Sequence, residues 1–469
     1  MGDPKKGPGE GHAWPFLAGV VTGVAGALLA KAVLPRRLLD ASLVPGSRED
    51  PDLAPTVLIP GILGNELLRP DGSSAWLNLG NVVGSHDVRL PYTLPFADSR
   101  DQLVPGGLLG ADTVVPRWFG FTEYADLLKL LRAAGFRREG ASLGAGAAFT
   151  VFAYDWRRDL AETACRLGEF LEALADARGD REARFNLVGH SMGGLIARYY
   201  LRFGAKPLGG EAPVTWAGAR RVSTLVLGAT PNAGAIPALD TLLNGARVGL
   251  SVATLSPAVV AGMPSLYQML PPAAAPALVA PNGEPIGADL HDIATWERFG
   301  WGPFAPTRRA GDLSEAPLDR EAHREFVTAA LGHARGLHGA LARKPQVACP
   351  ARVVALGGDC LPTLGRALVQ ERPGTAPRFE AWTRAEAAAM LEAGDGRVTR
   401  SSLLGSHLAG TGEAEGAPGI PEIGQAFLGD ADHHGLYADR AVQSLLLRLL
   451  LRPVRRSAAP RFAPSGAAR

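Results

Sequence analysis

The chain has 469 residues, of which 46% are hydrophobic and 20% are charged, and its formal net charge is +2. A chain of this length can bury a large core, and this composition excludes intrinsic disorder as the overall state. The near-neutral charge gives no electrostatic reason to expect nucleic acid as a partner. Only three cysteines are present, at positions 165, 349 and 360. They do not make a disulfide framework, so we expect three buried thiols.

Residues 1–50 are expected to form an N-terminal segment of their own. Within it, residues 14–34 are mostly apolar, and basic residues stand on both sides of this run. The uninterrupted apolar part is about 16 residues long, just under the roughly 20 that span a bilayer. Three interpretations stay open: a short membrane anchor, an export signal, or a helix packed on the catalytic domain. We therefore expect a membrane-associated or exported protein, with a cytoplasmic location as the alternative.

From residue 55 onward, short apolar strands alternate with amphipathic helices. The expected strands cover residues 56–59, 149–154, 185–188, 222–228 and 351–357. The expected helices cover residues 122–135, 159–177, 195–203, 319–341 and 438–451. This alternation predicts an α/β fold, with a mostly parallel sheet covered by helices on both faces. A ligand of such a sheet lies beyond the carboxyl ends of its strands.

A long segment, residues 233–348, separates the fourth expected strand from the fifth. It is too long for a loop, and it contains helical stretches joined by Pro, Ala and Gly-rich connections. We expect it to be a cap inserted over the active site. The catalytic domain as a whole is expected to cover residues 51–452. The Arg, Ala and Pro-rich tail, residues 453–469, is expected to be disordered.

The most informative motif is Gly189-His190-Ser191-Met192-Gly193, which stands between an expected strand and an expected helix. A strand, a Gly-x-Ser-x-Gly turn and a helix form the nucleophile elbow of the α/β-hydrolase fold. The turn lifts the Ser191 hydroxyl clear of the sheet, and the glycines let strand and helix approach closely. The Met192 N–H then lies at a helix N-terminus, where it can stabilise a developing oxyanion.

A nucleophilic serine needs a base, and the base needs a carboxylate that orients it, in the chain order Ser, Asp or Glu, His. Asp395 lies in a Gly-Asp-Gly turn and Asp359 follows the fifth strand, and position alone favours neither. The loop before the last helix offers His433 and His434 as the base. No Cys/His cluster and no phosphate-binding Gly-rich loop occurs in the sequence, so no metal and no cofactor is predicted.

The loop of residues 60–65, Pro-Gly-Ile-Leu-Gly-Asn, follows the first strand. In this fold the second oxyanion donor comes from that loop, and its two glycines let the backbone approach a substrate.

Taken together, these pieces resemble the lecithin:cholesterol acyltransferase-like family of α/β-hydrolases, in its bacterial lipase and acyltransferase form. The matching motifs are residues 59–65, 154–157, 189–194, 227–234, 264–271 and 394–396, followed by His433. They occur in the order of the family between residues 55 and 450. Their joint occurrence is far more specific than any one of them.

The resemblance implies a catalytic triad of Ser191, Asp395 and His433. It implies that the backbone N–H groups of Leu63 and Met192 form the oxyanion hole. It decides between the two candidate aspartates, which the residues alone did not. The spacing His-x-x-Leu-x-x-Asp-x-x-Val selects the first of the two adjacent histidines.

The resemblance also implies a serine acyl-enzyme catalyst that acts on lipid esters at a membrane or lipid surface, as an O-acyltransferase, phospholipase or lipase. A soluble esterase for small molecules and a non-catalytic lipid-binding protein are the alternatives. Trp156, in an Asp-Trp-Arg motif, is a candidate for contact with the acyl chain, and Trp76 is a second one. The alternative for Trp156 is a buried side chain beside an Arg–Asp pair. Protein partners are not predicted.

Two features depart from the family pattern. Arg397 stands where a small polar residue is usual, and no cysteine pair is present to pin a lid.

Overall fold

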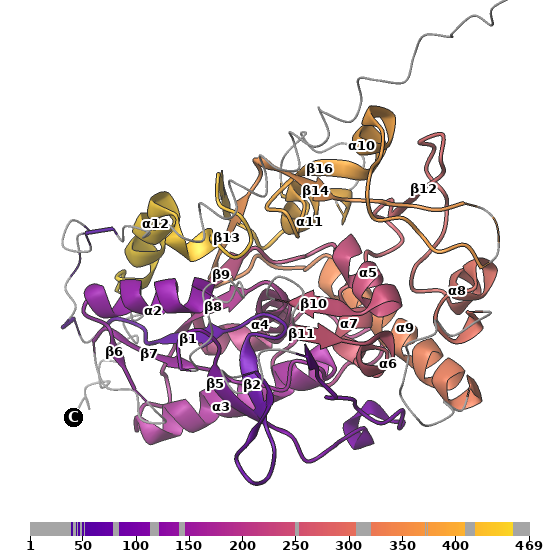
Figure 1. Cartoon of the computed structure of the whole chain (residues 1–469). Helices are drawn as coiled ribbons and strands as arrows, with labels where there is room; N and C mark the ends of the chain where they lie inside the picture. Colours follow the sequence, from indigo (N-terminus) through magenta and orange to yellow (C-terminus); the bar gives the residue numbers. More distant parts are fainter. Residues whose placement is uncertain are drawn as a thin grey trace, which may run out of the picture. The chain divides into compact units, whose positions relative to one another are not determined.

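A seven-stranded sheet in which every neighbouring pair is parallel forms the centre of the fold (Figure 1). Its strands, in spatial order, are β17 (Gln425–Gly429), β13 (Arg352–Gly358), β9 (Val222–Gly228), β8 (Phe185–His190), β1 (Thr56–Ile59), β7 (Ala148–Val151) and β6 (Arg137–Arg138). The computed structural model describes residues 39, 40, 44, 46, 49, 50, 52–77, 84–112, 122–139, 146–248, 253–305, 320–370, 372, 374–408 and 418–453. The predicted parallel sheet is confirmed.

Helices cover both faces of this sheet, as predicted. Outside the inserted segment they are α2 (Thr122–Ala133), α3 (Leu160–Ala177), α4 (Met192–Phe203), α11 (Arg400–Leu404) and α12 (Arg440–Leu450), whereas α10 (Arg384–Met390) packs on the small strands β15 and β16 described below. Successive residues of a strand point to opposite faces. Leu187 and Leu225 therefore pack in the core that contains α3 and α4, whereas Val188 and Val226 pack in the core that contains α2 and α12. Two apolar layers result, one on each face.

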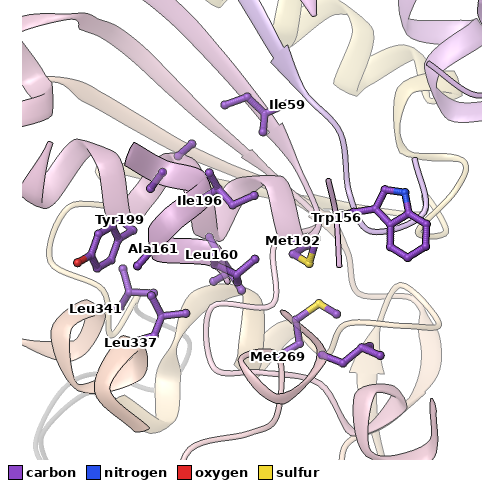
Figure 2. Close-up of a cluster of buried hydrophobic side chains, with 14 of the residues drawn as sticks. Ile59, Trp156, Leu160, Ala161, Met192, Ile196, Tyr199, Met269, Leu337 and Leu341 are labelled. Carbon is purple, nitrogen blue, oxygen red and sulfur yellow. The ribbon is translucent and has the colours of Figure 1, made fainter. Parts of the chain in front are cut away.

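The inserted segment between β9 and β13 consists of short elements. They are α5 (Ile236–Asn244), β10 (Ala246–Val248), β11 (Ala253–Leu255), α6 (Pro257–Val260), α7 (Pro264–Tyr267), β12 (Leu278–Val279), α8 (Ile293–Phe299), η5 (Gly302–Phe304) and α9 (Arg320–Ala342). Figure 2 shows Leu337 and Leu341 of α9, together with Met269, in one apolar cluster with residues of α3 and α4. The segment thus shares the apolar core that contains α3 and α4.

Small sheets and short helices complete the described part of the chain. The strands are β2 (Asn65–Leu68), β3 (Ser74–Trp76), β4 (Gly84–Ser85), β5 (Val104–Leu108), β14 (Leu361–Leu364), β15 (Ala367–Leu368) and β16 (Leu391–Gly394). The 3-10 helices are η2 (Phe96–Asp98), η4 (Ala217–Arg220), η6 (Ser406–Leu408) and η7 (Leu436–Ala438). The sheet β3–β2–β5 follows directly on the loop of residues 60–65, so it fixes where that loop ends.

Several expected boundaries differ from the observed ones. The strand expected over residues 149–154 ends at Val151, because the chain makes one more bond, Phe152 N–H to Leu58 O, and then turns away. The edge strands β6 and β17 were not predicted, since they are partly or fully exposed and contain at most three consecutive apolar residues. The expectation of three buried thiols was wrong: Cys165 and Cys349 are half-buried and Cys360 is exposed.

Two expectations fall outside the described residues, namely the apolar segment 14–34 and the tail beyond residue 453. Across the part of the chain that the structure describes, no helix has both the length and the hydropathy to cross a bilayer.

Candidate active site

Ser191 occupies the turn between β8 and α4 with φ 52° and ψ −124°. This conformation is strained for a residue with a side chain, and such strain is concentrated at functional sites. The glycines of the motif make the turn possible. A Cβ on Gly193 would lie 2.3 Å from Ile59 O, and one on Gly189 would lie 2.7 Å from the Cα of Gly194. The elbow predicted from the sequence is therefore present.

Asp395 and His433 are brought together although 38 positions separate them. His433 Nδ1 and Asp395 Oδ2 are 2.9 Å apart, and both side chains are buried. Burial raises the pKa of Asp395, but His433 and the N–H groups of Val398 and Arg397 outweigh it, so the pKa lies below its ordinary value. An ionised carboxylate only accepts hydrogen bonds, so His433 Nδ1 carries the proton. His433 Nε2 is then the basic nitrogen.

A tight turn holds the Asp395 carboxylate in place. Its Oδ1 accepts the backbone N–H of Arg397 at 2.9 Å and that of Val398 at 2.7 Å. Arg397, the departure from the family pattern, contributes this backbone group, which any residue other than proline supplies. Asp359, the rejected alternative, lies with Oδ2 3.8 Å from Arg400 Nη1.

The base loop, defined here as residues 430–435 between β17 and η7, lies beside the elbow. His190 Nε2 is 3.3 Å from the carbonyl oxygen of His433, and the two rings are 5.1 Å apart between centroids. Since His190 directly precedes Ser191, this contact places the base loop next to Ser191. The ring of His434 packs edge-on against His433 at 5.4 Å.

The oxyanion loop, a name used here for residues 60–65 because of the role predicted for them, runs against Ser191. A Cβ on Gly61 would lie 3.0 Å from the Cβ of Ser191. Leu63 has a positive φ of 62°, which is uncommon for a leucine. Among the described residues, the Leu63 N–H has no backbone acceptor. The Met192 N–H is in the first turn of α4, where an N–H has no partner within the helix.

The side chains of Trp76 and Trp156 both donate hydrogen bonds to the oxyanion loop. Both side chains have an exposed fraction of 0%, and their rings meet edge-on at 5.8 Å. The indole N–H of Trp76 donates to Leu63 O at 3.3 Å, and that of Trp156 donates to Asn65 O at 3.1 Å. Contact of either ring with an acyl chain stays a prediction.

The Asp-Trp-Arg motif has the Arg–Asp geometry considered as its alternative role. Arg157 is fully buried and forms ion pairs with Asp155 at 2.8 Å and with Asp101 at 2.6 Å. Its Nη1 also donates to the carbonyl of Val88 at 2.9 Å. Burial lowers the pKa of Arg157, but the two carboxylates outweigh it and the net pKa is raised. The Arg157 side chain thus connects residues 88–101 with the segment that follows β7.

Sequence reasoning missed two tyrosines that contact the oxyanion loop. The Tyr154 hydroxyl donates to Pro60 O at 2.7 Å, and the Tyr124 hydroxyl accepts the N–H of Gly61 at 2.8 Å. Tyr154 belongs to the motif of residues 154–157, one of those that carry the family resemblance, and this motif could have pointed to a role for it in the site. Tyr124 is one residue of an amphipathic helix, where nothing local distinguishes it.

A cavity of about 820 Å³ lies at the end of the sheet opposite to Ser191. Its lining includes residues just before β1, β8, β9 and β13, so it faces the amino ends of the strands. Three arginines and three acidic residues line it together: Arg178, Arg184, Arg220, Asp52, Asp180 and Glu182. This balanced set favours no single ligand. Within the described ranges, no group of three or more His, Cys, Asp or Glu side chains is placed to hold a metal ion.

The sheet order, the elbow serine and the Asp–His pair define the fold as that of an α/β-hydrolase. Residues 104–286 match the model of the lecithin:cholesterol acyltransferase family, which confirms the family resemblance. No protein of curated function matches the chain.

Several solved structures show a distant similarity to this chain. A chain of the Tle4-Tli4 complex is 15% identical, with a TM-score of 0.48, over 85% of this chain and 98% of that one. The mature lipase BlEst2 of Bacillus licheniformis is 12% identical, with a TM-score of 0.32, over 87% and 95%. EstA of Clostridium botulinum is 14% identical, with a TM-score of 0.36, over 90% and 92%. At these values the similarities carry no argument about fold or function.

Proposed function

We propose that this protein is a serine-dependent acyl-transfer enzyme that cleaves lipid esters through an acyl-enzyme. The family match and the site together support chemistry on ester bonds, by hydrolysis or by transfer to an alcohol. The observation that carries the proposal is the pairing of Asp395 with His433 Nδ1 at 2.9 Å, beside a strained elbow serine. This pairing leaves His433 Nε2 free to act as a base.

In the first half-reaction, Ser191 Oγ attacks the ester carbonyl carbon while His433 Nε2 takes the hydroxyl proton. The N–H groups of Leu63 and Met192 stabilise the oxyanion. The bond from the carbonyl carbon to the alkoxy oxygen then breaks, and His433 gives its proton to the departing alcohol. The acyl group is left on the serine.

In the second half-reaction, an acceptor hydroxyl gives its proton to His433 and attacks the acyl-serine. Water as acceptor yields a free acid, and an alcohol yields a new ester. His433 returns the proton to Ser191 Oγ as the product leaves. Transfer to an alcohol requires a site that excludes water, a role for which the inserted segment between β9 and β13 is the candidate.

The lipid part of the proposal rests on the family match and on the apolar run of residues 14–34. A segment of this kind would hold the enzyme at a membrane, where ester lipids are found. Deletion of residues 1–37 should release the protein from membranes and leave hydrolysis of a soluble ester unchanged. Retention of the truncated protein on membranes would contradict the anchoring role.

The catalytic part is tested by labelling the wild type and Ser191→Ala with a fluorophosphonate and measuring intact mass. One adduct on the wild type and none on the variant is the expected result. Absence of an adduct on folded wild type would overturn the acyl-enzyme mechanism.

The acceptor is tested on phospholipid vesicles with and without a sterol or a long-chain alcohol. Formation of the new ester identifies a transferase, and release of fatty acid alone identifies a lipase or phospholipase. A preference for short, monomeric esters over phospholipid vesicles, with or without an alcohol acceptor, would favour the small-molecule esterase instead.

A further inference from the structure

A hydrogen-bonded pair of side chains, Tyr124 and His190, connects the oxyanion loop with the base loop. Tyr124 lies on α2, on the opposite side of the sheet from α3 and α4, and its hydroxyl accepts the Gly61 N–H at 2.8 Å. The same hydroxyl is 3.0 Å from His190 Nδ1. On the far side of the ring, His190 Nε2 is 3.3 Å from the carbonyl oxygen of His433. Four groups therefore form one continuous chain.

The direction of these bonds follows from their chemistry. A carbonyl oxygen can only accept, so His190 Nε2 carries a proton and donates it to His433 O. Burial lowers the pKa of His190 well below its ordinary value, and the neighbouring His433 and His434 lower it further, so the ring is neutral near pH 7. Its Nδ1 is then an acceptor for the Tyr124 hydroxyl proton. Every bond runs in one direction, from Gly61 to His433.

We propose that Tyr124 and His190 are positioning residues that fix the oxyanion loop and the base loop relative to each other across Ser191. Both side chains are buried, and their rings meet edge-on at 5.6 Å. His190 is the last residue of β8, so its backbone belongs to the central sheet.

The consequence for catalysis is geometric. The oxyanion donor at Leu63 is two residues beyond Gly61, whose N–H the Tyr124 hydroxyl fixes. The base loop is held through His433 O, which belongs to the residue that transfers the proton. A misplacement of about 1 Å of either group can cost a large part of the rate. The outer hydrogen bonds of the pair go to backbone groups of these two loops, so the pair acts through the loops.

The proposal rests on the proposed acyl-enzyme mechanism, and its test separates the two. Tyr124→Phe keeps the ring and removes only the hydroxyl. We expect kcat on a soluble activated ester to fall about tenfold with KM unchanged, less than the roughly 10²–10³-fold loss when an oxyanion donor itself is removed. Rates are normalised to the sites that a fluorophosphonate titrates, so that misfolded protein does not count.

His190 offers a rescue by a conservative variant. Glutamine can place an amide N–H where His190 Nε2–H lies, whereas phenylalanine keeps the ring and has no donor. We expect His190→Gln to retain clearly more of kcat than His190→Phe. The double variant Tyr124→Phe/His190→Phe should lose little more than the worse single variant, because residues that act as a unit are not additive.

Tyr267→Phe is the matched control. The Tyr267 hydroxyl is also buried and donates to a backbone carbonyl, that of Ala261, at 2.9 Å. This variant should lose thermal stability and keep its rate per titrated site. Wild-type turnover per site in Tyr124→Phe, or equal rates for the two His190 variants, would overturn the positioning proposal. A wild type that is not labelled at Ser191 would instead overturn the proposed function, and the positioning proposal with it.

Discussion

Asp395 and His433 are joined twice. The His433 Nδ1–H donates to Asp395 Oδ2 at 2.9 Å, and the His433 backbone N–H donates to the Asp395 carbonyl at 2.9 Å. The side-chain bond sets the tautomer of the ring, and the backbone bond sets the distance between the two loops. The position of the basic nitrogen thus depends on both loops together.

Asp395→Asn should abolish most of the activity. An amide at this position no longer fixes the productive tautomer of His433, so we expect kcat to fall roughly 10³–10⁴-fold while the protein stays folded. The measurement is steady-state hydrolysis of an activated ester. Asp359→Asn is the control, since the Asp359 carboxylate points to Arg400. A large loss in the control and none in Asp395→Asn would assign the acid to the other loop.

The two adjacent histidines should differ sharply. His433→Gln removes the base, and we expect kcat to fall at least about 10³-fold. His434→Gln leaves the bonds between Asp395 and His433 in place and should retain most of the activity. Phosphonylation rates on both variants give the same comparison without a substrate, and equal rates would contradict the assignment.

Removing the hydrogen bonds that the two tryptophans donate to the oxyanion loop should lower kcat. Trp76→Phe and Trp156→Phe keep an apolar ring but remove the N–H that donates to Leu63 O or Asn65 O. From the loss of these hydrogen bonds we expect kcat to fall about tenfold with KM unchanged. Both should be compared across esters of increasing chain length.

Trp296→Phe is the control for that series, because its indole N–H donates to Leu290 O within the inserted segment. A change in chain-length preference for Trp156→Phe, with kcat retained, would instead support direct contact with the acyl chain.

A buried ion triad should stabilise the helix that follows the nucleophile. Glu422 accepts Arg198 Nε at 2.7 Å and Arg202 Nη1 at 2.8 Å, and all three side chains have an exposed fraction of 0%. Glu422→Gln leaves two buried guanidinium groups without their carboxylate. We expect the free energy of unfolding, measured with urea, to fall by about 3–5 kcal/mol. Asp87→Asn, at an exposed pair with Arg89, should cost less than about 1 kcal/mol.

The same triad predicts a pH dependence. Burial raises the pKa of Glu422, but the two arginines outweigh it and the folded pKa lies below the ordinary value of 4.5. A carboxyl with a lowered folded pKa contributes its full stability above its unfolded pKa and loses it as the pH falls through the folded value. The difference between wild type and Glu422→Gln should be constant above about pH 5.5 and shrink below pH 4.5. A difference that grows on acidification would contradict this sign.

Local sequence was sufficient for the fold class and for the turn that holds Ser191. The apolar run of β8, the Gly-x-Ser-x-Gly turn and the start of α4 are consecutive, so their pattern alone predicts the elbow. Strands with continuous apolar runs were found for the same reason. The edge strand β17 was missed, because it has only one neighbouring strand, stays partly exposed and contains both polar and apolar residues.

The partners of the nucleophile depended on tertiary structure. Residues alone left two aspartates and two histidines open, and family resemblance was needed to choose among them. Asp395 and His433 meet across 38 positions, Tyr124 and His190 across 66, and His190 and His433 across 243. No local propensity encodes such contacts, since they arise only when the sheet, α2 and the base loop pack together. The sequence by itself determined what kind of protein this is, and the packing of distant segments decided which side chains surround its serine.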